Sequence, residues 1–379
     1  MRRKVLILSQ SIMHTDPRVI RQISFFHKNG YSVVLSGLSY DGELEFYPIK
    51  KQKSIFSRAL KLILLLIRNI RLREKELLWQ SSYGILSSYP TAFTFILAND
   101  VESWPIAIAL KSHHTKTKVI FDAHEQYAKE FTDDFKWQYF HKNFVTYLCK
   151  EYIPKADAFI TVCEGIARDY QNEVGVLGDI VLNAPDFESN LVPSPVTNKI
   201  QLIHHGISNR SRKIEKMIRL MDYLDDRFEL KLMLMNTDEN YLGELRKLAL
   251  GKPIQFIEPV STQAISGFIN QFDIGLFILE PVNFNYANAL PNKFFEFIQA
   301  RLAIAIGPTP EMKRIVEKEK IGIVTDTFDE REMAQCLNAL SISDIEKMKE
   351  NSHLVASDYS NIANEKVLNR IIERLTVLD

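Results

Sequence analysis

The sequence predicts two α/β domains, each a doubly wound parallel sheet with helices on both faces. Three observations indicate this class. Short β-branched apolar runs alternate with helix-length segments, a stretch with three prolines at 183–199 interrupts the alternation, and the same alternation then restarts. The 379 residues are enough for two packed cores, because a domain commonly has about 150 residues.

The first domain is predicted to comprise residues 1–185. Its first strand, at 4–9, is followed by a helix over 17–28 that begins with Asp16 as the N-cap and Pro17 in the first turn. Asn29 and Gly30 end this helix, because both residue types are common just past a helix terminus. The remaining strands of this domain are predicted at 31–37, 94–100, 118–124, 157–163 and 179–185.

The second domain is predicted to comprise residues 186–361 and to repeat the same layout. Ligands of doubly wound sheets bind beyond the carboxyl ends of the strands. We therefore expect the two domains to face each other across a central cleft that is lined by strand-end loops. The strands of this domain are predicted at 199–206, 230–236, 254–260, 273–279, 303–308 and 322–325.

Charge is balanced over the whole chain, with 47 basic and 47 acidic side chains. A dedicated nucleic-acid-binding domain is normally basic, so we expect no nucleic-acid partner. The balance hides an asymmetry, because residues 1–185 carry 24 basic and 19 acidic side chains. Eight basic side chains and a single acid, Glu74, lie within 51–75, and such a block indicates an anionic partner.

Residues 55–75 have the pattern of one amphipathic helix, with basic side chains on one side and aliphatic side chains on the other. Two interpretations remain open. The helix lies on an anionic membrane surface, or it packs its apolar stripe on the sheet of the first domain. The basic side consists of Arg58, Lys61, Arg68, Arg71 and Lys75, and the aliphatic side consists of Ile55, Leu62, Ile63, Leu66 and Ile70.

The three cysteines, Cys149, Cys163 and Cys336, are odd in number and lack metal-ligand spacing, which favours a reduced cytosolic protein. The apolar run at 5–8 is too short for a signal-peptide core. The longest apolar stretch, 62–67, is far below the roughly 18 residues that span a bilayer. We expect a cytoplasmic protein, with 55–75 as the candidate for peripheral contact with the inner face of the plasma membrane.

The most informative segment is 288–307, whose pattern indicates a loop, a helix and a strand. Pro291 suits the first helical turn, where free backbone N–H groups bind phosphate. Lys293 can add a charge-assisted contact, and the carboxylate of Glu296 can accept two hydrogen bonds from a ribose. The alternative is a surface helix on which Lys293 and Glu296 are solvated, since short patterns often match by chance.

Basic side chains follow the first predicted strand of the second domain. Gly206 permits a tight turn there, and Arg210, Arg212 and Lys213 precede a helix, an arrangement suited to a diphosphate. The alternative is a solvated basic helix start, although such charge opposes the helix dipole unless an anion is present. Pro259 ends another predicted strand, where a plain turn explains it equally well.

Polar side chains also end two strands of the first domain. His124 stands between Asp122 and Glu125, and a histidine in such a place can orient an acceptor hydroxyl or move a proton. Asp100 ends the preceding strand, and Asp16 opens the first helix, so both are further acceptor-side candidates. The alternatives are a structural, hydrogen-bonded role for His124 and a plain helix cap for Asp16.

Taken together, these motifs resemble the GT-B-fold glycosyltransferases of family four, the retaining enzymes of bacterial cell-surface polysaccharide synthesis. The resemblance implies the GT-B architecture, with a C-terminal helix at 362–379 that returns to the first domain. The matching stretches follow the family's order over nearly the whole chain: KVLILSQSIMHTDPRVIRQISFFHKNGYSVVL, FILAND, IFDAHEQY, KADAFITVCEGIARDY, VLNAPDF, HHGISNRSRKIE, ALPNKFFEFIQARLAIAIGPTPEMKRIV and the terminal DYS.

The resemblance also implies roles for single residues. Glu296 matches the second glutamate of the family's paired-glutamate motif, which holds the nucleotide ribose, whereas Asn288 stands where the first glutamate, near the donor sugar, is usual. Arg212 matches a basic residue that holds the diphosphate, and His124 matches a histidine near the reacting sugar. The second basic position of the family falls on Lys213 or Lys293. The remaining donor-binding candidates are Gly206, Arg210, Pro259, Leu290 and Asn292.

The chain departs from the family at two further places. Arg301 stands where a small residue or glycine is usual. The loop after the first strand, SQSIMHTD, contains no glycine, although it is glycine-rich in many members. We therefore expect acceptor-side contacts of this loop to differ from those of the family.

The expected reaction transfers a glycosyl group from a nucleoside-diphosphate sugar to an acceptor hydroxyl of a lipid-linked or polysaccharide glycan, in capsule or lipopolysaccharide synthesis. Its transition state separates a cationic sugar from a departing diphosphate, so positive charge is needed there. His124, Arg212 and Lys293 are the expected catalytic residues. The resemblance implies retention of anomeric configuration. No Asp-x-Asp motif lies near the expected donor site, so we expect no metal and no cofactor.

Other functions of this fold stay open. A nucleotide-sugar epimerase would use the same cleft, whereas a sugar phosphorylase would normally bring a pyridoxal-phosphate lysine or a longer chain. An inactive scaffold subunit that binds a sugar nucleotide is an alternative of another class, and Asn288 is the feature that favours it.

Overall fold

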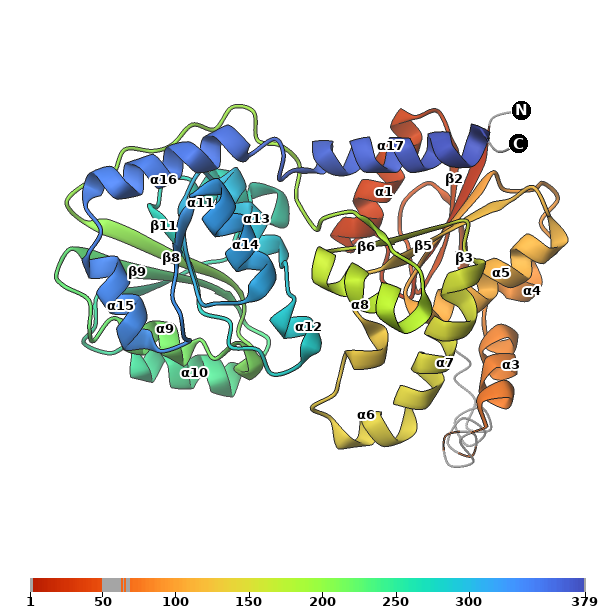
Figure 1. The fold of residues 1–379 in the computed structure, drawn as a ribbon, viewed down its shortest axis with the longest axis horizontal. Coiled ribbons are helices and arrows are strands. Elements are labelled where there is room, and N and C mark those ends of the chain that lie inside the picture. The colour runs from red at the N-terminus through yellow and green to blue at the C-terminus, as the bar shows by residue number, and fades with distance from the viewer. Residues whose placement is uncertain (1–2, 50–62, 64, 66–68, 378–379) are drawn as a thin grey trace. The chain divides into compact units, whose positions relative to one another are not determined.

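The structure is a computed structural model of the chain, and it describes residues 3–49, 63, 65 and 69–377. It divides into two compact units, each of the predicted class (Figure 1). The first unit comprises Met1–Val181, Asn283–Asn285 and Glu365–Asp379, and the second comprises Leu182–Val282 and Tyr286–Asn364. The main boundary lies four residues before the one expected from the sequence.

The first unit contains a seven-stranded parallel sheet in the order β3-β2-β1-β4-β5-β6-β7. Four of the five residues of β1 are fully buried, because helices cover both faces of the sheet. All six predicted strands are present, although the last is only two residues long, and β3 was not predicted. The strands are β1 (Lys4–Leu8), β2 (Ser32–Gly37), β3 (Glu45–Pro48), β4 (Phe95–Asn99), β5 (Lys118–Ala123), β6 (Ala158–Thr161) and β7 (Asp179–Ile180).

Helices cover both faces of this sheet. Helix α1 begins as predicted, with the Asp16 carboxylate accepting hydrogen bonds from two backbone N–H groups of its first turn. One face packs against α1 and α17, which contributes Leu368 and Ile371 to the core (Figure 1). On the other face the Trp104 ring of α5 stacks on Phe121 at 5.0 Å. The helices are α1 (Pro17–Lys28), α3 (Ile70–Gln80), α4 (Tyr83–Leu86), α5 (Trp104–His113), α6 (Phe135–Phe140), α7 (Lys142–Tyr152) and α8 (Glu164–Val174).

Most of the helix predicted at 55–75 lies outside the described residues. The prediction of one continuous helix is wrong at its described end. Asn69 has an extended backbone, with φ −80° and ψ 107°, and its side chain accepts from the N–H of Leu72, so it is the N-cap of a separate helix, α3. Arg73 of α3 donates to the Phe140 carbonyl near α7. Contact of 55–75 with a membrane stays a prediction, and none of the described helices is both long and apolar enough to cross a bilayer.

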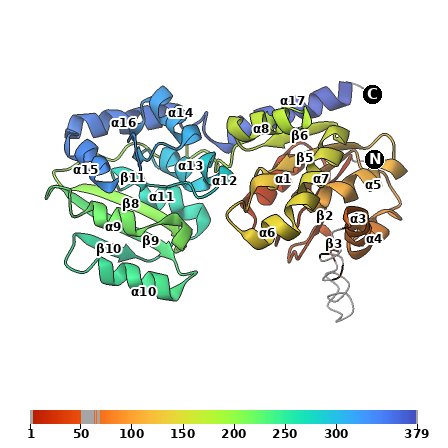
Figure 2. The same ribbon diagram turned by 60° about the horizontal axis from the view of Figure 1, so that its bottom comes forward.

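The second unit contains a six-stranded parallel sheet in the order β10-β9-β8-β11-β12-β13, and all six predicted strands are present. One face buries an aliphatic core against α9, α10 and α15. Figure 2 shows α10 on one side of this sheet and α14 and α16 on the other. The strands are β8 (Ile200–Ile207), β9 (Phe228–Met235), β10 (Ile254–Ile257), β11 (Ile274–Phe277), β12 (Ala303–Ile306) and β13 (Gly322–Val324).

Short helices connect these strands. Two helices, α12 (Phe284–Ala287) and α17 (Asn361–Val377), have residues in both units. The other helices of the second unit are α9 (Glu215–Leu220), α10 (Glu239–Leu248), α11 (Ile265–Ile269), α13 (Asn292–Gln299), α14 (Pro310–Glu319), α15 (Glu330–Asn338) and α16 (Ile342–Val355). Single 3₁₀ turns lie in the first unit at η1 (Val101–Ser103), η2 (Tyr127–Lys129) and η3 (Ile153–Lys155), and in the second unit at η4 (Arg210–Arg212) and η5 (Thr262–Ala264).

Each sheet has one point at which the strand order reverses. In the first unit it lies between β1 and β4, and in the second between β8 and β11. At such a point the loops after two neighbouring strands diverge and leave a crevice at the carboxyl edge. The loops that follow these strands are therefore the places where each unit can bind a ligand.

Candidate functional site

The end of β8 brings a buried histidine to the reversal point of the second unit. The His204 ring is fully buried, and its Nδ1 lies 2.9 Å from the carbonyl oxygen of Leu276, which can only accept. Nδ1 therefore carries the proton and Nε2 has a free lone pair. Burial lowers the pKa of His204 well below its ordinary value, so the ring is neutral.

Lys293 lies across the end of this strand. Its Nζ is 3.4 Å from His204 Nε2 and 4.5 Å above the centre of the Phe277 ring. A Cβ atom at Gly206 would lie 2.9 Å from the same Nζ, and Gly206 has φ +128°. The positive φ favours glycine at this position, and any larger residue would displace the end of the Lys293 side chain.

The Lys293 amine has no carboxylate within ion-pair distance among the described residues. Burial and, to a smaller extent, the charge of Arg212 lower its pKa, Glu296 acts in the opposite direction, and the net pKa is about 7. A buried amine without an anionic partner loses its proton more readily, and a negative charge beside it would favour the charged form. This is the electrostatic state expected of a free anion-binding site.

Arg212 is the second cation of this group. Its guanidinium lies 4.7 Å above the Tyr286 ring, and it also has no carboxylate partner in the part of the chain that the structure describes. The ring contact leaves the N–H groups at the guanidinium edge able to donate to a phosphate. The charge of Arg212 contributes to the lowered pKa of Lys293, so the two cations lie in the same region of the second unit.

The two other basic residues expected at the diphosphate are already neutralised. Arg210 forms two hydrogen bonds with Glu244, at 2.8 and 2.7 Å. Lys213 donates to Glu280 at 2.9 Å. The structure thus groups Arg212 with Lys293 and leaves Arg210 and Lys213 in ion pairs of their own, and the predicted contacts of these two with a diphosphate stay predictions.

Glu296 lies on α13 and is only 6% exposed. Its Oε2 is 3.4 Å from Nε2 of His205, but the geometry is not that of a hydrogen bond, and Nε2 is buried without a hydrogen-bond partner among the described residues. Burial, followed by the charge of Lys293, lowers the pKa of His205 to about 3, so this ring is neutral as well. A hydroxyl group could bridge the two side chains.

The remaining donor-side candidates lie in the segment before and at the start of α13. Pro291 is the N-cap of α13 and Asn292 its first residue, so the expectation that Pro291 is in the first turn is wrong by one position. Pro291 has extended ψ 154°, which places it before the helix. Leu290 is buried, and Asn288 is half-buried.

A cavity of about 520 Å³ lies at the carboxyl ends of β9 and β10, under α10. Pro259, the donor-side candidate after β10, is part of its wall together with Glu258. Arg246 also lines it, with its guanidinium 5.7 Å from the centre of the Phe256 ring.

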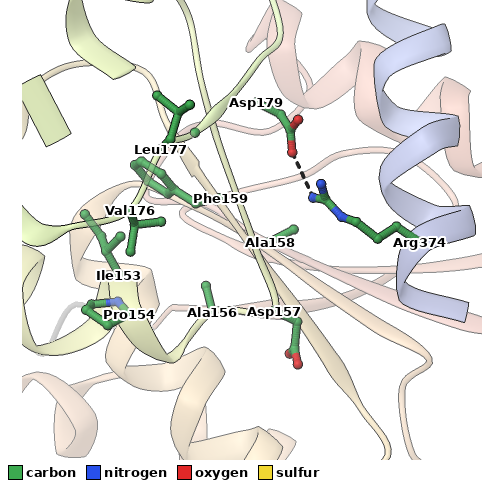
Figure 3. A pocket seen from close by; sticks show the side chains of 11 residues that line it. Ile153, Pro154, Ala156, Asp157, Ala158, Phe159, Val176, Leu177, Asp179 and Arg374 are labelled. Carbon is green, nitrogen blue, oxygen red and sulfur yellow. Dashed lines mark hydrogen bonds and ion pairs between the residues drawn. The ribbon is translucent and has the colours of Figure 1, made fainter. Parts of the chain in front are cut away.

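A second hollow, of about 360 Å³, lies in the first unit at the amino ends of β6 and β7. Figure 3 shows the Asp179–Arg374 ion pair, at 2.8 Å, on one side of it. Asp157 is also paired, with Lys111. This hollow lies at the amino ends of the strands, whereas the predicted acceptor-side residues lie at the carboxyl ends. Asp157, Asp179 and Arg374 in its wall all have ion-pair partners, so we do not assign the hollow to the candidate site.

In the first unit the structure shows what surrounds Asp122. Both of its oxygens accept from the Arg18 guanidinium, at 2.6 and 2.7 Å, and both side chains are buried. Burial is the largest single effect and raises the pKa of Asp122, but the charges and hydrogen bonds of Arg18 and His124 together outweigh burial and hold the pKa below its ordinary value. Asp122 therefore faces a protein partner rather than an open site, and its direct contact with an acceptor stays a prediction.

Asn99 and Gln22 connect this ion pair to His124. The Gln22 amide donates to Asp122 at 2.8 Å and to Asn99 Oδ1 at 2.9 Å. His124 Nε2 lies 3.2 Å from Asn99 Oδ1 and 3.6 Å from Asp122 Oδ2. The His124 side chain remains 22% exposed. A partly exposed histidine at the end of β5 is thus held from behind by a buried polar network.

Asp100 is held in an unusual backbone conformation, with φ 61° and ψ 139°. Its carboxylate accepts from Ser9 Oγ at 3.0 Å and from the N–H of Gln10 at 2.8 Å. It therefore fixes the loop after β1. Asp16 caps α1, as described above. Near Glu125, burial and then the Glu125 charge raise the pKa of Glu130 to about 7.

No group of three or more metal-ligating side chains occurs in the described part of the chain. The three cysteines form no disulfide. The residues that sequence reasoning missed are polar groups behind the predicted ones: Arg18, Gln22, Asn99, His204, His205 and Tyr286. One signal was available, because Arg18 and Gln22 are four residues apart on a helix and so share a face.

No protein-family model and no curated protein matches the sequence. Solved structures do resemble it in fold. A sucrose-phosphate synthase from Thermosynechococcus elongatus is similar with TM-score 0.71 and 10% identity, over 100% of both chains. HepE of Anabaena in complex with UDP is similar with TM-score 0.69 and 11% identity, over 98% of this chain and 100% of that one. An α,α-trehalose 6-phosphate synthase from Burkholderia multivorans gives TM-score 0.67 and 10% identity over 100% of both chains. The predicted GT-B fold is thereby confirmed at the level of fold.

Proposed function

We propose that this protein is a glycosyltransferase that moves a sugar from a nucleoside-diphosphate sugar to an acceptor hydroxyl. One observation carries the proposal: Lys293 lies across the end of β8, Arg212 follows the same strand and its charge acts on Lys293, and neither has a carboxylate partner among the described residues. A diphosphate supplies the missing negative charge. Support comes from the solved structures of the same fold, one of which holds UDP and two of which are sugar-phosphate synthases.

The donor half of the reaction follows from these two cations. The bond between the sugar C1 and the diphosphate oxygen breaks, and its electron pair stays on the diphosphate. Arg212 and Lys293 stabilise the charge that develops there, which is the largest demand of the transition state. Because the two side chains supply that charge, we propose turnover without a metal ion.

Glu296 and the loop after β10 would hold the nucleoside. The carboxylate of Glu296 would accept from ribose hydroxyls, and His205 Nε2, which has no hydrogen-bond partner among the described residues, lies beside it. The base would reach the cavity beside Pro259, two strands away from β8, or about 9.6 Å at the usual spacing.

The acceptor half is assigned to the first unit. The acceptor oxygen forms the new bond to C1, and its proton passes to the departing diphosphate. His124 would orient a hydroxyl of the reacting sugars. The resemblance to family four supports retention of configuration and an acceptor in a lipid-linked or polysaccharide glycan, and both are part of the proposal.

Nucleotide binding is the first test. UDP, GDP, ADP and CMP are compared by thermal shift and then by calorimetry, because a ligand of the native state raises its stability. We expect one nucleoside diphosphate to bind, and Arg212→Gln or Lys293→Met to weaken it at least tenfold, as expected for a loss of about 1.5–3 kcal/mol from a charge-assisted hydrogen bond.

Arg331→Gln is the matched control. Arg331 also lies over a tyrosine ring in the second unit, 5.2 Å from the centre of Tyr223, but it belongs to α15 and is exposed. Its loss should leave the affinity unchanged. If the Arg212 and Lys293 variants bind the nucleotide as strongly as the unaltered protein does, the proposed donor site is overturned.

A binding subunit without catalysis is the second candidate, because Asn288 stands where family four has a glutamate near the donor sugar. Mass spectrometry of the products formed from the bound nucleotide sugar, with and without glycan acceptors, separates the two. If the unaltered protein releases the nucleoside diphosphate and the Glu296→Ala variant does not, the result supports the function as a transferase. Tight binding with no turnover under any acceptor condition supports the binding subunit.

A further inference from the structure

The buried network behind His124 determines which ring nitrogen is protonated. Asp122 is paired with Arg18 and is a carboxylate, so it can only accept. The Gln22 atom 2.8 Å from it must therefore be the NH₂ group, and Oε1 of the same amide points to Asn99. The orientation of the first amide follows from the charge of Asp122.

Two hydrogen bonds fix the orientation of the second amide, that of Asn99. The Asn99 Nδ2 donates to Gln22 Oε1 at 3.0 Å and to the carbonyl oxygen of Leu8 at 3.2 Å. Both partners are acceptors, so the NH₂ group of Asn99 cannot be exchanged with its oxygen. Asn99 Oδ1 is consequently the atom that faces His124.

His124 Nε2 thus has two oxygen neighbours, Asn99 Oδ1 at 3.2 Å and Asp122 Oδ2 at 3.6 Å, and neither can donate. Nε2 must carry the proton. In a neutral imidazole the other nitrogen, Nδ1, then has a lone pair. Nδ1 has no hydrogen-bond partner in the part of the chain that the structure describes, and the side chain is 22% exposed.

We propose that His124 acts on its substrate through Nδ1, which accepts a hydrogen bond from a carbohydrate hydroxyl, and that Asn99 is the positioning residue that holds the ring in this tautomer. Gln22, Asp122 and Arg18 keep Asn99 in place. The part that concerns a carbohydrate rests on the proposed function, whereas the protonation of the ring does not.

The tautomer is tested on the free, full-length protein. Nitrogen NMR of a sample labelled in histidine distinguishes protonated from unprotonated ring nitrogens, and the His124 signals are identified by their loss in a His124→Gln variant. We expect protonated Nε2 and unprotonated Nδ1 above the pH at which the ring is doubly protonated. The reverse tautomer would overturn the inference, whether or not any sugar transfer is found.

Asn99→Leu tests the positioning role in the same spectrum. This variant removes the nearer acceptor at Nε2 and leaves only Asp122 Oδ2 at 3.6 Å, so we expect a measurable fraction of the Nδ1-protonated tautomer to appear. An unchanged single tautomer in a folded Asn99→Leu protein would contradict the role of Asn99, since another group would then hold the ring.

A matched pair of substitutions tests which atom meets the substrate. An asparagine at 124 places an amide atom near the position of Nδ1, whereas a glutamine reaches the position of Nε2 and keeps the contact with Asn99. We expect His124→Asn to retain at least tenfold more transferase activity than His124→Gln, because hydrogen bonds of a positioned side chain contribute on this scale. Higher activity of His124→Gln would show that Nε2 is the reactive atom and overturn the proposal.

Discussion

Nζ of Lys293 lies 3.4 Å from Nε2 of His204, and it occupies the space that a side chain at position 206 would need. The neutral histidine can accept from the ammonium but does not neutralise it. The three residues therefore hold one cation at the carboxyl edge of the sheet while leaving its charge available to a ligand. This arrangement leads to the first two predictions.

Gly206→Ala should impair nucleotide binding. The added Cβ would lie 2.9 Å from Lys293 Nζ, and an alanine at φ +128° is strained by about 1–3 kcal/mol. We expect at least a tenfold weaker nucleotide affinity by calorimetry and a lower unfolding midpoint in urea. Gly267→Ala is the control, because nothing lies within 4 Å of that position and its φ is ordinary. Equal effects of the two variants would contradict the role of Gly206.

Nucleotide affinity should fall as the pH rises above 7. The pKa of Lys293 is about 7 in the free protein, because burial disfavours its charged form. A bound diphosphate needs the charged amine, so binding above pH 7 takes up a proton and the Kd weakens by up to about tenfold per pH unit. The nucleotide phosphate itself is fully ionised in this range, since its second pKa is about 6.

Calorimetry in buffers of different ionisation enthalpy measures this proton uptake directly. We expect almost one proton per nucleotide near pH 8 in the unaltered protein and close to none in Lys293→Met. Proton uptake that persists in Lys293→Met would assign the pH dependence to another group.

Arg18→Met should destabilise the first unit by about 3–5 kcal/mol, because it leaves the buried Asp122 carboxylate without its partner. In the double variant Arg18→Met/Asp122→Leu the free energy of unfolding should recover in part, since no unpaired charge remains. Urea unfolding of the single and double variants gives this difference. For comparison, Arg374→Met breaks the exposed pair with Asp179 and should cost at most about 1 kcal/mol.

Arg301→Gly should destabilise the second unit although glycine suits the backbone at this position. Arg301 has φ 60°, which glycine adopts without strain. Its buried guanidinium, however, donates to the carbonyl oxygens of Glu188 and Gln299, both at 2.6 Å, and lies 5.5 Å from the centre of the Phe187 ring. Losing these contacts should outweigh the relief of strain and lower the free energy of unfolding by about 1–3 kcal/mol. An unfolding curve like that of the unaltered protein would show that the contacts contribute little.

The sequence predicted every strand that is buried on both faces, because a continuous apolar run is a local signal. It did not predict β3 (Glu45–Pro48), a four-residue edge strand whose exposed and half-buried residues carry no such signal. The N-cap at Asn69 also escaped prediction, since the amphipathic pattern on either side of it continues in phase.

Single site residues were predictable only in part. Candidates such as His124 at a strand end and Lys293 at a helix start could be singled out from their place in the pattern. Their partners do not, because Arg18 and Asp122 are 104 positions apart and only the folded sheet brings them together. The same holds for Lys293 and His204, which are 89 positions apart.

The left-handed backbone of Asp100 has a consequence for the loop after β1. This loop contains no glycine, and it is held from outside by the Asp100 carboxylate, which accepts from Ser9 and Gln10, and by backbone hydrogen bonds of Ser11 and Met13 with Leu38 and Ser39. A segment tied to its neighbour in this way is ordered before any substrate arrives, so little conformational entropy is lost when one binds. The rigidity that other sequences would obtain from a tight glycine turn is supplied here by neighbouring segments, and one of the contributors is a strained aspartate just past the adjacent strand.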